Sequence, residues 1–391
     1  MKIVRLAVSL LFAIAVSAPA LAQSPQSQKA APKGKAAPKE IVIGHVAGYT
    51  GPVTKDATDM GVGAQVYFDA VNARGGMLGR KFRILVIDDH FKPDETVQFI
   101  LSLNGKISAL LSPVGSANFD RVLKEGVLEK IDFPILGVIP GVESFRQPLR
   151  KNMYHFRAGD LDQLEKIVVL TTSVGQSKIA VLATDNPNGE SVIAYLNGTL
   201  AKRNLKLAAA PKYVIGPKID WAPAIKTLQT AQPDVVILLG PPFATAGFIK
   251  EAKTAGLASS LYGLSYTDHR LATKLAGNQL VRGVAIAQVF PNPANRVVPL
   301  IKEFRDNFDK YGKEKGVVPS HFNLEGYIAG KIIAEAIRKS KDSSAAGVAR
   351  GLEMLKDYDL GGYVVDFSPT KHTGSTFVDM SIISSSGELI Y

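Results

Sequence analysis

The sequence predicts an α/β fold with two Rossmann-like lobes, each a parallel sheet flanked by helices. Residues 41–89 read as strand, Gly-rich turn, helix, Gly-Gly stop and second strand, which is the pattern of a β-α-β unit. Apolar strands and amphipathic helices then alternate along the chain, and the alternation restarts near Ser177. This alternation indicates parallel sheets wrapped by helices. The chain has 391 residues, which is enough for two domains, because single cores stop growing at about 250–300 residues.

The individual elements are predicted from the periodicity of the apolar residues and from the glycine and proline residues that begin or end them. Apolar residues recur at helical spacing along residues 58–73, from Met60 to Val71, so they share one face. The pair Gly75 and Gly76 ends this helix, because glycine readily adopts positive φ. Strands are predicted at residues 40–46, 83–88, 107–111, 134–137, 178–183, 235–239, 283–288, 362–367 and 377–383. Later helices are predicted at residues 243–255, 299–310 and 321–340.

The N-terminus carries the features of an export signal. Lys2 and Arg5 precede an apolar run at residues 6–16, and Ala20-Leu21-Ala22 forms a small-x-small cleavage site. The apolar run is shorter than the roughly 20 residues that a membrane-spanning helix needs. Residues 1–22 are therefore predicted to be a signal peptide. Residues 23–39, rich in Ala, Pro, Lys, Gln and Ser, are predicted to be a flexible tether. The mature protein is expected outside the cytoplasm.

Composition and motifs exclude several classes of chemistry. The chain has no cysteine, which removes disulfides, thiolate metal sites and Cys nucleophiles. No two of the six histidines lie at i, i+4, and no phosphate-binding or serine-hydrolase motif is present. More than half of the net charge of +11 lies in the signal peptide and tether, so the pI near 9.5 does not indicate nucleic-acid binding. We expect a protein that is not an enzyme, with no cofactor, no metal and no nucleic-acid partner.

Two features remain open from the residues alone. Asp88 and Asp89, at the end of a strand, are either a paired carboxylate site or a solvated strand terminus and helix cap. The loop after residues 107–111 runs to Ser116, Ala117 and Asn118 at the start of a helix. Such residues either leave backbone N–H groups free for a carboxylate or form a plain helix cap. The loops at residues 138–141, 184–189 and 240–243 also follow strands, where ligands of open sheets bind.

A set of short motifs, in order along residues 40–391, resembles the type I periplasmic solute-binding proteins of ABC importers, in the branched-chain amino acid (Leu/Ile/Val) group. This resemblance implies two lobes joined by three crossovers, with a ligand in the cleft and closure about the hinge. It places lobe one at residues 40–160 plus 289–362 and lobe two at residues 161–288 plus 363–391. It also makes the Asp88-Asp89 pair a structural signature. The motifs are Thr50-Gly51-Pro52, FDAVNARGGMLGR from Phe68, Asp88-Asp89, Lys92-Pro93-Asp94, Ser116, Phe156-Arg157-Ala158 with Asp162, DNPNG from Asp185, QPDVV from Gln232 and LEGYIAGK from Leu324.

The resemblance carries some ligand-binding positions over directly. The hydroxyl that binds the ligand carboxylate falls on Ser116. The acid that binds the ligand ammonium, five residues after Arg157, falls on Asp162. The loop after the fourth strand contributes Ile139 and Gly141.

At other positions the sequence departs from the family. Asp56, Asn188 and Pro241 stand where the family has aromatic residues, and Ser265 stands where it has a second acid. The frequent disulfide partners of the family fall on Phe91 and Gly115. These departures imply a cleft more polar than is usual in the family.

The resemblance implies a receptor that delivers a small amino-acid-like or carboxylate-bearing solute to an ABC permease in the inner membrane. The permease contact is expected to be transient, and the protein is expected to be a monomer. The resemblance also places the mature protein in the periplasm. One alternative is a periplasmic receptor subunit that signals instead of delivering the solute. Another is a binding protein for a different solute, such as an aromatic acid or an amide.

Overall fold

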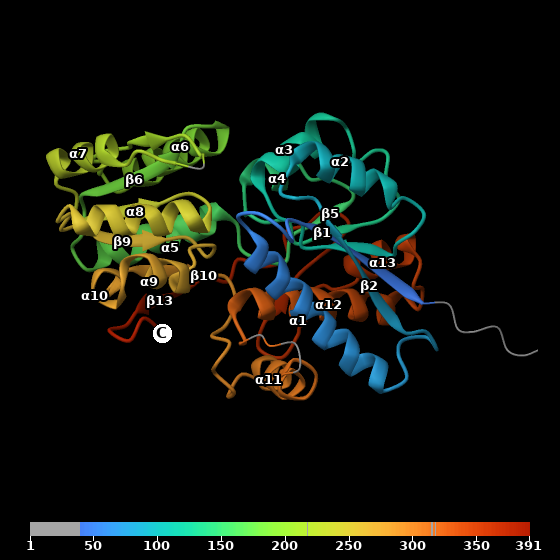
Figure 1. Ribbon diagram of the computed structural model, residues 1–391. Helices are drawn as coiled ribbons and strands as arrows, with labels where there is room; N and C mark the ends of the chain where they lie inside the picture. Colours follow the sequence, from blue (N-terminus) through green and yellow to red (C-terminus); the bar gives the residue numbers. More distant parts are fainter. Residues whose placement is uncertain (1–39, 217, 314–315, 317) are drawn as a thin grey trace, which may run out of the picture. The chain divides into compact units, whose positions relative to one another are not determined.

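Figure 1 shows a computed structural model of the chain, which describes residues 40–216, 218–313, 316 and 318–391. It confirms the predicted α/β class with two sheets of mainly parallel strands, each covered on both faces by helices. The signal peptide and the tether predicted at residues 1–39 lie outside the described residues.

The first sheet has five strands, and all of its pairings are parallel. They are β1 (Ile41–Ala47), β2 (Phe82–Asp88), β3 (Ala109–Leu111), β4 (Ile135–Leu136) and β5 (Met153–Tyr154), in the order β2-β1-β3-β4-β5. Side chains alternate between the two faces, so Leu111 joins one hydrophobic cluster and Leu110 the other. Because both faces are covered, the strands appear in the sequence as continuous apolar runs.

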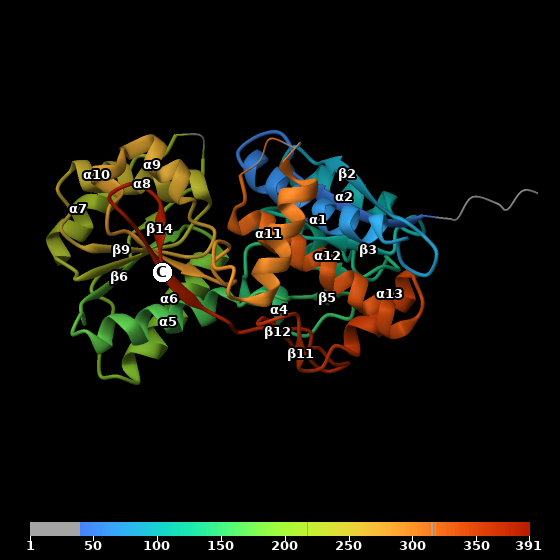
Figure 2. The same ribbon diagram turned by 90° about the horizontal axis from the view of Figure 1, so that it is seen from below.

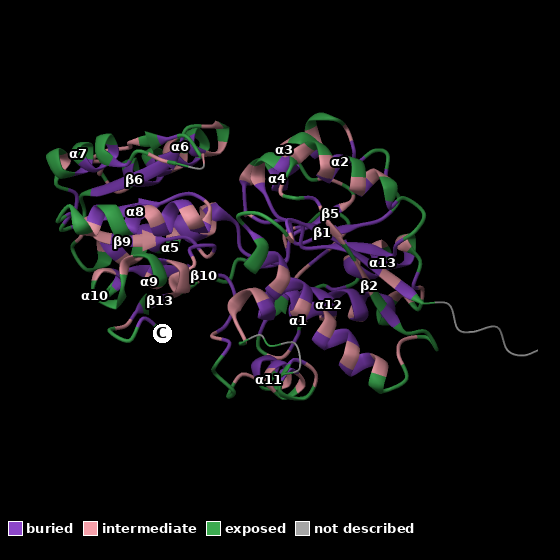
Figure 3. Ribbon diagram, in the orientation of Figure 1, coloured by how far each residue is buried: buried purple, intermediate pink, exposed green. Residues whose placement is uncertain are grey.

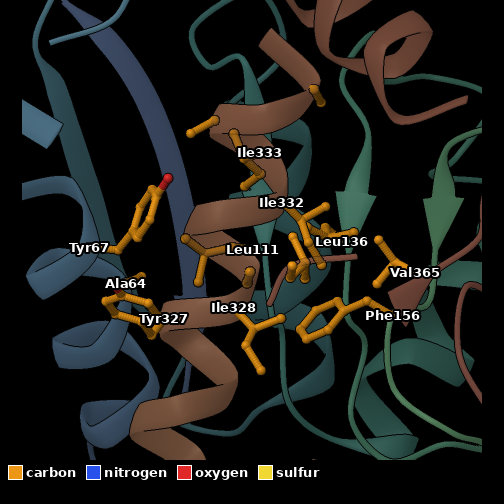
Figure 4. Close-up of a cluster of buried hydrophobic side chains, with 14 of the residues drawn as sticks. Ala64, Tyr67, Leu111, Leu136, Phe156, Tyr327, Ile328, Ile332, Ile333 and Val365 are labelled. Carbon is orange, nitrogen blue, oxygen red and sulfur yellow. The ribbon is translucent and has the colours of Figure 1, made fainter. Parts of the chain in front are cut away.

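Helices from distant parts of the sequence cover this sheet. One face carries α1 (Thr54–Ala73), α11 (Pro299–Tyr311), α12 (His321–Ser340) and α13 (Ala345–Glu353). The other carries α2 (Pro93–Ser102), α3 (Ser116–Lys124) and α4 (Glu143–Arg146). Figure 4 shows the first of these clusters, in which Ile328 and Ile332 of α12 lie near Leu136 and Phe156. We call the first sheet with these helices lobe one.

Two glycines allow α1 and α12 to pack at close range. A Cβ atom on Gly63 of α1 would lie 1.9 Å from the carbonyl oxygen of Asn323. A Cβ atom on Gly326 of α12 would lie 1.9 Å from the carbonyl oxygen of Met60. The side chain of Asn323 also donates to the carbonyl oxygen of Asp59 at 2.6 Å. The two helices therefore approach backbone to backbone, which fixes the start of α1 relative to the start of α12.

The second sheet has five parallel strands and two antiparallel strands at one edge. The parallel strands are β6 (Ile179–Thr184), β7 (Lys212–Tyr213), β8 (Val235–Leu238), β9 (Ser260–Gly263) and β10 (Ala285–Gln288). The edge strands are β13 (Asp379–Ile383) and β14 (Leu389–Ile390), and the order is β14-β13-β10-β9-β8-β6-β7. The last two strands add the C-terminus to this sheet (Figure 2).

Six helices cover the second sheet, and we call this sheet with them lobe two. α5 (Asp160–Ser173) and α6 (Pro187–Ala201) lie on one face. The other face carries α7 (Ala222–Ala231), α8 (Pro242–Thr254), α9 (His269–Ala276) and α10 (Asn278–Val281). In Figure 3 the strands β6, β8 and β10 are buried along their length, whereas the outer sides of α6 and α7 are exposed. Both lobes are therefore three-layered, with a hydrophobic cluster on each side of the sheet.

The chain passes between the two sheets three times, in agreement with the resemblance. It leaves the first sheet after β5, returns to it between β10 and α11, and leaves it again before β13. Ahead of this last passage lies a small hairpin of β11 (Tyr358–Asp359) and β12 (Val364–Val365). The first and third passages lie side by side, because His155 and Thr373 form a parallel bridge.

Most predicted elements exist, with boundaries displaced by at most four residues. The helix predicted at residues 321–340 coincides with α12 in both its first and its last residue. Gly75 and Gly76 have the expected positive φ, of 99° and 80°. The strands β5, β7, β9, β11 and β14 were not predicted. Four of them are only two residues long, which leaves no periodicity to detect. The fifth, β9, is four residues long and follows closely after α8, so its apolar residues were not distinguished from those of the helix.

Candidate functional site

A cavity of about 440 Å³ lies among loops that follow the strands of both sheets. Lobe one lines it with residues from the loops after β1, β2, β3 and β4. Lobe two lines it with residues from the loops after β6, β7, β8 and β9. All of these loops leave the carboxyl ends of parallel strands, which is where ligands bind in open α/β sheets. The volume is within the range of small-molecule pockets.

The N-terminus of α3 forms one wall of this cavity. Gly115, Ser116 and Ala117 all line it. Gly115 is the N-cap and provides no side chain to accept from the first N–H groups of the helix, which lack intrahelical acceptors. Its φ of 122° requires glycine, and a Cβ atom there would lie 2.9 Å from the ring of Phe91. The wall therefore presents the hydroxyl of Ser116 and the positive end of a helix to the cavity.

Asn118, predicted beside Ser116 as a ligand-binding residue, lies beneath this wall and does not line the cavity. It is buried, and its side-chain amide donates to the hydroxyl of Thr96 at 2.7 Å. That hydroxyl donates to Asp89 at 2.6 Å, and Asp89 also accepts from the N–H of Phe91 at 2.9 Å. This network holds the loop after β2 against α3.

The two aspartates at the end of β2 therefore have structural roles. Asp88 accepts from the hydroxyl of Thr50 at 2.8 Å and from the N–H of His90 at 2.8 Å. These hydrogen bonds lower the pKa of Asp88 against the opposing effect of desolvation. Neither aspartate lines the cavity. The structure agrees with the reading of this pair as a structural signature rather than as a paired carboxylate site.

Asp56 lies in the first turn of α1 and lines the cavity. Its relative exposure is 6%, and no hydrogen bond to its carboxyl group is found among the described residues. Burial raises the pKa of Asp56 well above its usual value, and the neighbouring Asp268 and Asp59 raise it further. The nearby Lys55 is paired with Asp59 at 2.8 Å. Asp56 is thus a buried acid whose charge is poorly compensated.

The wall from lobe two contains both polar and apolar groups. Asn188, in the first turn of α6, and Pro241, at the start of α8, line the cavity as the sequence predicts. The neighbouring Asn186 caps α6 by accepting from the N–H of Gly189 at 3.1 Å. Val214 also lines the cavity, although it is 70% exposed. Ile139, from lobe one, also lines the cavity and is buried.

The structure places three further predicted residues away from the cavity lining. Asp162 accepts from the N–H of Gly159 at 2.8 Å and so caps α5. Gly141 donates its N–H to Asp160 at 3.1 Å. The hydroxyl of Ser265 accepts from Arg157 at 2.5 Å. Each of these residues positions a segment next to the cavity.

Arg157 is the centre of a buried polar cluster next to the first passage between the lobes. Its guanidinium lies 3.1 Å from Glu325 of α12 and 2.5 Å from the hydroxyl of Ser265, which follows β9. The sequence predicted only that Arg157 marks the spacing to an acid. The structure shows that it joins a helix of lobe one to a loop of lobe two. Arg157 and Glu325 are almost fully buried, so this pair is shielded from solvent.

Asp160 completes the cluster. Burial raises its pKa to about 6, although Arg157 and Arg146 act in the opposite direction. The hydroxyl of Tyr266, which lines the cavity, faces Asp160, and burial raises the pKa of that tyrosine too. The cavity is therefore connected to the inter-lobe cluster through Tyr266.

Apart from Ala117, Ile139 and Pro241, the sequence did not identify the apolar residues that make up most of the lining. Val53, Met60, Val114 and Ile139 belong to a hydrophobic cluster against which Phe91 and Phe322 pack, and all six line the cavity. Most of the wall is therefore apolar, whereas Asp56 and Asn188 contribute polar groups to it. Phe91 and Gly115, the positions of the family's disulfide, are in contact, so an aromatic ring occupies that space. The sequence could show that these two positions are neighbours, because the family's disulfide joins them. It did not indicate that the ring of Phe91 lines the cavity.

Within the described ranges, no group of three or more His, Asp or Glu side chains is placed to hold a metal ion. No helix in that same part of the chain has the length and apolarity to cross a membrane.

Comparisons with known proteins extend these observations. Residues 40–386 match the family described as "Periplasmic binding protein". A Brucella abortus (strain 2308) protein named "Leu/Ile/Val-binding protein homolog 7" is 24% identical over 342 residues, which cover 82% of each chain. An extracellular ligand-binding receptor from Verminephrobacter eiseniae ef01-2 has a TM-score of 0.83 and 30% identity, over 90% of this chain and 100% of that chain. A branched chain amino acid ABC transporter from Thermus thermophilus, solved with bound valine, has a TM-score of 0.77 and 20% identity, over 91% and 96%.

Proposed function

This chain belongs to the periplasmic binding proteins, in the type I group related to branched-chain amino acid receptors, and we propose that it binds a small amino-acid-like or carboxylate-bearing solute. Proteins of this family bind substrates and are not enzymes. One observation carries the proposal: the cavity of about 440 Å³ is lined by the strand-end loops of both lobes. A ligand there contacts both lobes at once, so its binding favours whichever relative position of the lobes completes those contacts.

The proposed lobes are residues 40–160 plus 289–362 and residues 161–288 plus 363–391. The two large sheets support this division, because β1 to β5 fall in the first set of residues and β6 to β10, β13 and β14 in the second. β12 is an exception, because it pairs with β11 and its Val365 packs in the lobe-one cluster, which favours a boundary after β12. We expect the lobes to close on the ligand by rotation about the three passages of the chain, which is the hinge mechanism of two-lobed binding proteins.

Ser116 and Ala117 are the proposed anchor for a ligand carboxylate. The support is their position at the N-terminus of α3, where the helix dipole and the free N–H groups favour an anion. Asp56, Ile139, Asn188 and Pro241 are proposed to complete the walls. A further group is proposed to hold these walls in place without contact to the ligand: Asn118, Gly141, Asp162 and Ser265.

The proposed partner is an ABC permease of the inner membrane, which the receptor meets transiently as a monomer in its ligand-bound form. The support is the relation to substrate-binding proteins, among them the Thermus thermophilus ABC transporter protein. The family is extracytoplasmic, and residues 1–22 are proposed to be the signal peptide that directs this chain there.

The test begins with a thermal-shift screen of the mature protein against amino acids, aromatic acids and amides. For any carboxylate ligand found, Ser116→Ala should weaken binding, because it removes a hydroxyl that hydrogen-bonds to a charged group, worth about 1.5–3 kcal/mol. Isothermal titration calorimetry measures the change. Ser102→Ala, an exposed hydroxyl in the last turn of α2, is the control. Equal affinity of wild type and Ser116→Ala would remove Ser116 from the site.

A further inference from the structure

We propose that Asp56 holds a cationic amine of the ligand, and that this amine, rather than the carboxylate, is required for binding. The inference rests on the proposed function, because it places the ligand in the same cavity. It assigns the ligand to a chemical class: amine-bearing solutes with an apolar body.

The position of Asp56 is the first observation that supports this inference. Its relative exposure is 6%, it lines the cavity, and no donor to its carboxyl group is found among the described residues. A buried carboxyl group without a hydrogen-bond partner is costly, and the cost is larger when the group is ionised. A donor supplied by the ligand removes this cost. An amine also supplies the opposite charge that the acid lacks.

The charges of the lining point in the same direction. Asp56, Asp120 and Asp185 line the cavity, whereas no Lys, Arg or His residue does so among the described residues. The cations near the cavity are engaged elsewhere: Lys55 pairs with Asp59, and Arg157 pairs with Glu325. A ligand that brings a positive charge therefore balances the site, and one that brings only a negative charge adds repulsion.

Asp120 is the acid that would repel a ligand carboxylate bound at Ser116. It lies four residues after Ser116 on α3, so both side chains lie on the same side of the helix, and both line the cavity. Burial raises the pKa of Asp120, while Lys124 lowers it. A carboxylate anchored at Ser116 thus lies near an acidic side chain. An acid without an amine has no compensating contact in the lining.

The other acids near the first passage of the chain are already engaged. Asp162 accepts from the N–H of Gly159, and Asp160 accepts from the N–H of Gly141. Neither lines the cavity. The resemblance gives Asp162 the role of binding the ligand ammonium. We assign this role instead to Asp56, which belongs to the other lobe.

The rest of the wall defines the body of the ligand. Met60, Phe91 and Phe322 come from lobe one, and Ile215 and Tyr266 come from lobe two. Aliphatic and aromatic side chains on two sides favour a branched or aromatic group between them.

The experiment compares ligands that share an apolar body and differ only in charged groups. One series is leucine, 3-methylbutylamine and 4-methylpentanoate; a second is phenylalanine, phenethylamine and 3-phenylpropanoate. Each is tested by thermal shift and by isothermal titration calorimetry on the mature wild-type protein. We expect the amino acid and the amine of at least one series to bind, and the acid to bind about 10- to 150-fold more weakly, as for a lost charge-assisted hydrogen bond.

Asp56→Asn provides the second arm, because asparagine keeps the shape of the side chain and removes its charge. It should lower amine affinity by a similar factor. Asp94→Asn should leave the affinity unchanged; Asp94 is also an acid in the first turn of a helix, but it is exposed. If Asp56→Asn melts at a lower temperature than the wild type, the comparison of the ligands on the wild-type protein still tests the inference.

Equal binding of acid and amine, or unchanged amine binding by Asp56→Asn, overturns the inference. Binding of the acids alone overturns it as well but leaves the proposed carboxylate receptor standing. Failure of all six compounds counts against both the inference and the proposed function.

Discussion

Asp160 and Asp162 are two residues apart, yet the structure uses them differently. α5 begins at Asp160, so this side chain turns inward and is buried beside Arg157, Arg146 and Tyr266. Asp162 is the third residue of the same helix and turns back to the N–H of Gly159. The spacing from Arg157 indicated that an acid matters here. The register of α5, which decides which acid faces the interior, was not readable from the sequence.

A pH prediction belongs to Asp160. Its folded-state pKa of about 6 lies above the ordinary value, so the folded state binds the proton more tightly than the unfolded state does. Asp160 therefore adds to the free energy of unfolding when the pH is below its ordinary pKa. This contribution is lost as the pH rises through about 6. Asp160→Asn removes this dependence.

The measurement is urea denaturation of wild type and Asp160→Asn between pH 4 and 7. Buried histidines act in the opposite direction: burial lowers the pKa of His45 to about 4, so it favours unfolding at low pH. This contribution is common to both proteins and cancels in their difference. The free energy of unfolding of wild type should fall relative to that of the variant across this window. A constant difference would contradict the account.

At the scale of elements, the crossing of α1 and α12 explains one sequence motif. The LEGYIAGK segment was recognised as part of a family pattern. Its physical reason is that Gly326 lies against the backbone of α1, as Gly63 of α1 lies against the backbone of α12. Helix positions were predictable, because α12 has a long apolar period. Their partners were not, because α1 and α12 lie far apart in the sequence.

Gly63→Ala should therefore destabilise lobe one by several kcal/mol, since overpacking of a tight core costs about 1–3 kcal/mol or more. The new Cβ atom would meet a backbone oxygen, which cannot move aside as a flexible side chain can. Urea denaturation gives the change. Gly198→Ala in α6 is the matched control, because a Cβ atom there meets nothing within 4 Å. This control should stabilise the protein by about 0.5–1 kcal/mol, since alanine favours helices over glycine. Equal effects of the two substitutions would refute the close-packing explanation.

At the scale of the whole molecule, the sequence predicted the class, the three passages between sheets and part of the cavity wall. It missed what joins the lobes. Arg157 lies after β5, Glu325 on α12 and Ser265 after β9, so three remote segments meet in one cluster. Much of the apolar lining was missed for the same reason, because Phe91 and Phe322 are 231 positions apart in the sequence yet pack against the same hydrophobic cluster. Contacts of this kind depend on tertiary structure, which local patterns do not encode.

Glu325→Gln tests this cluster, because it leaves the guanidinium of Arg157 buried without its carboxylate. Breaking a buried ion pair costs about 3–5 kcal/mol. The loss should appear as a lower free energy of unfolding in urea at pH 7. Glu125→Gln removes an exposed partner of Arg121 and should cost less than about 1 kcal/mol. A loss of similar size in both variants would mean that burial adds nothing to the pair.

Val214 lies on the cavity wall and is 70% exposed, and the chain has no cysteine. A thiol introduced at this position is therefore the only one in the protein and reacts with a dye without side products. The dye reports changes in polarity at the cavity edge, so solute binding becomes a fluorescence signal. The same receptor can then serve as a reagentless sensor with which unlabelled compounds are ranked.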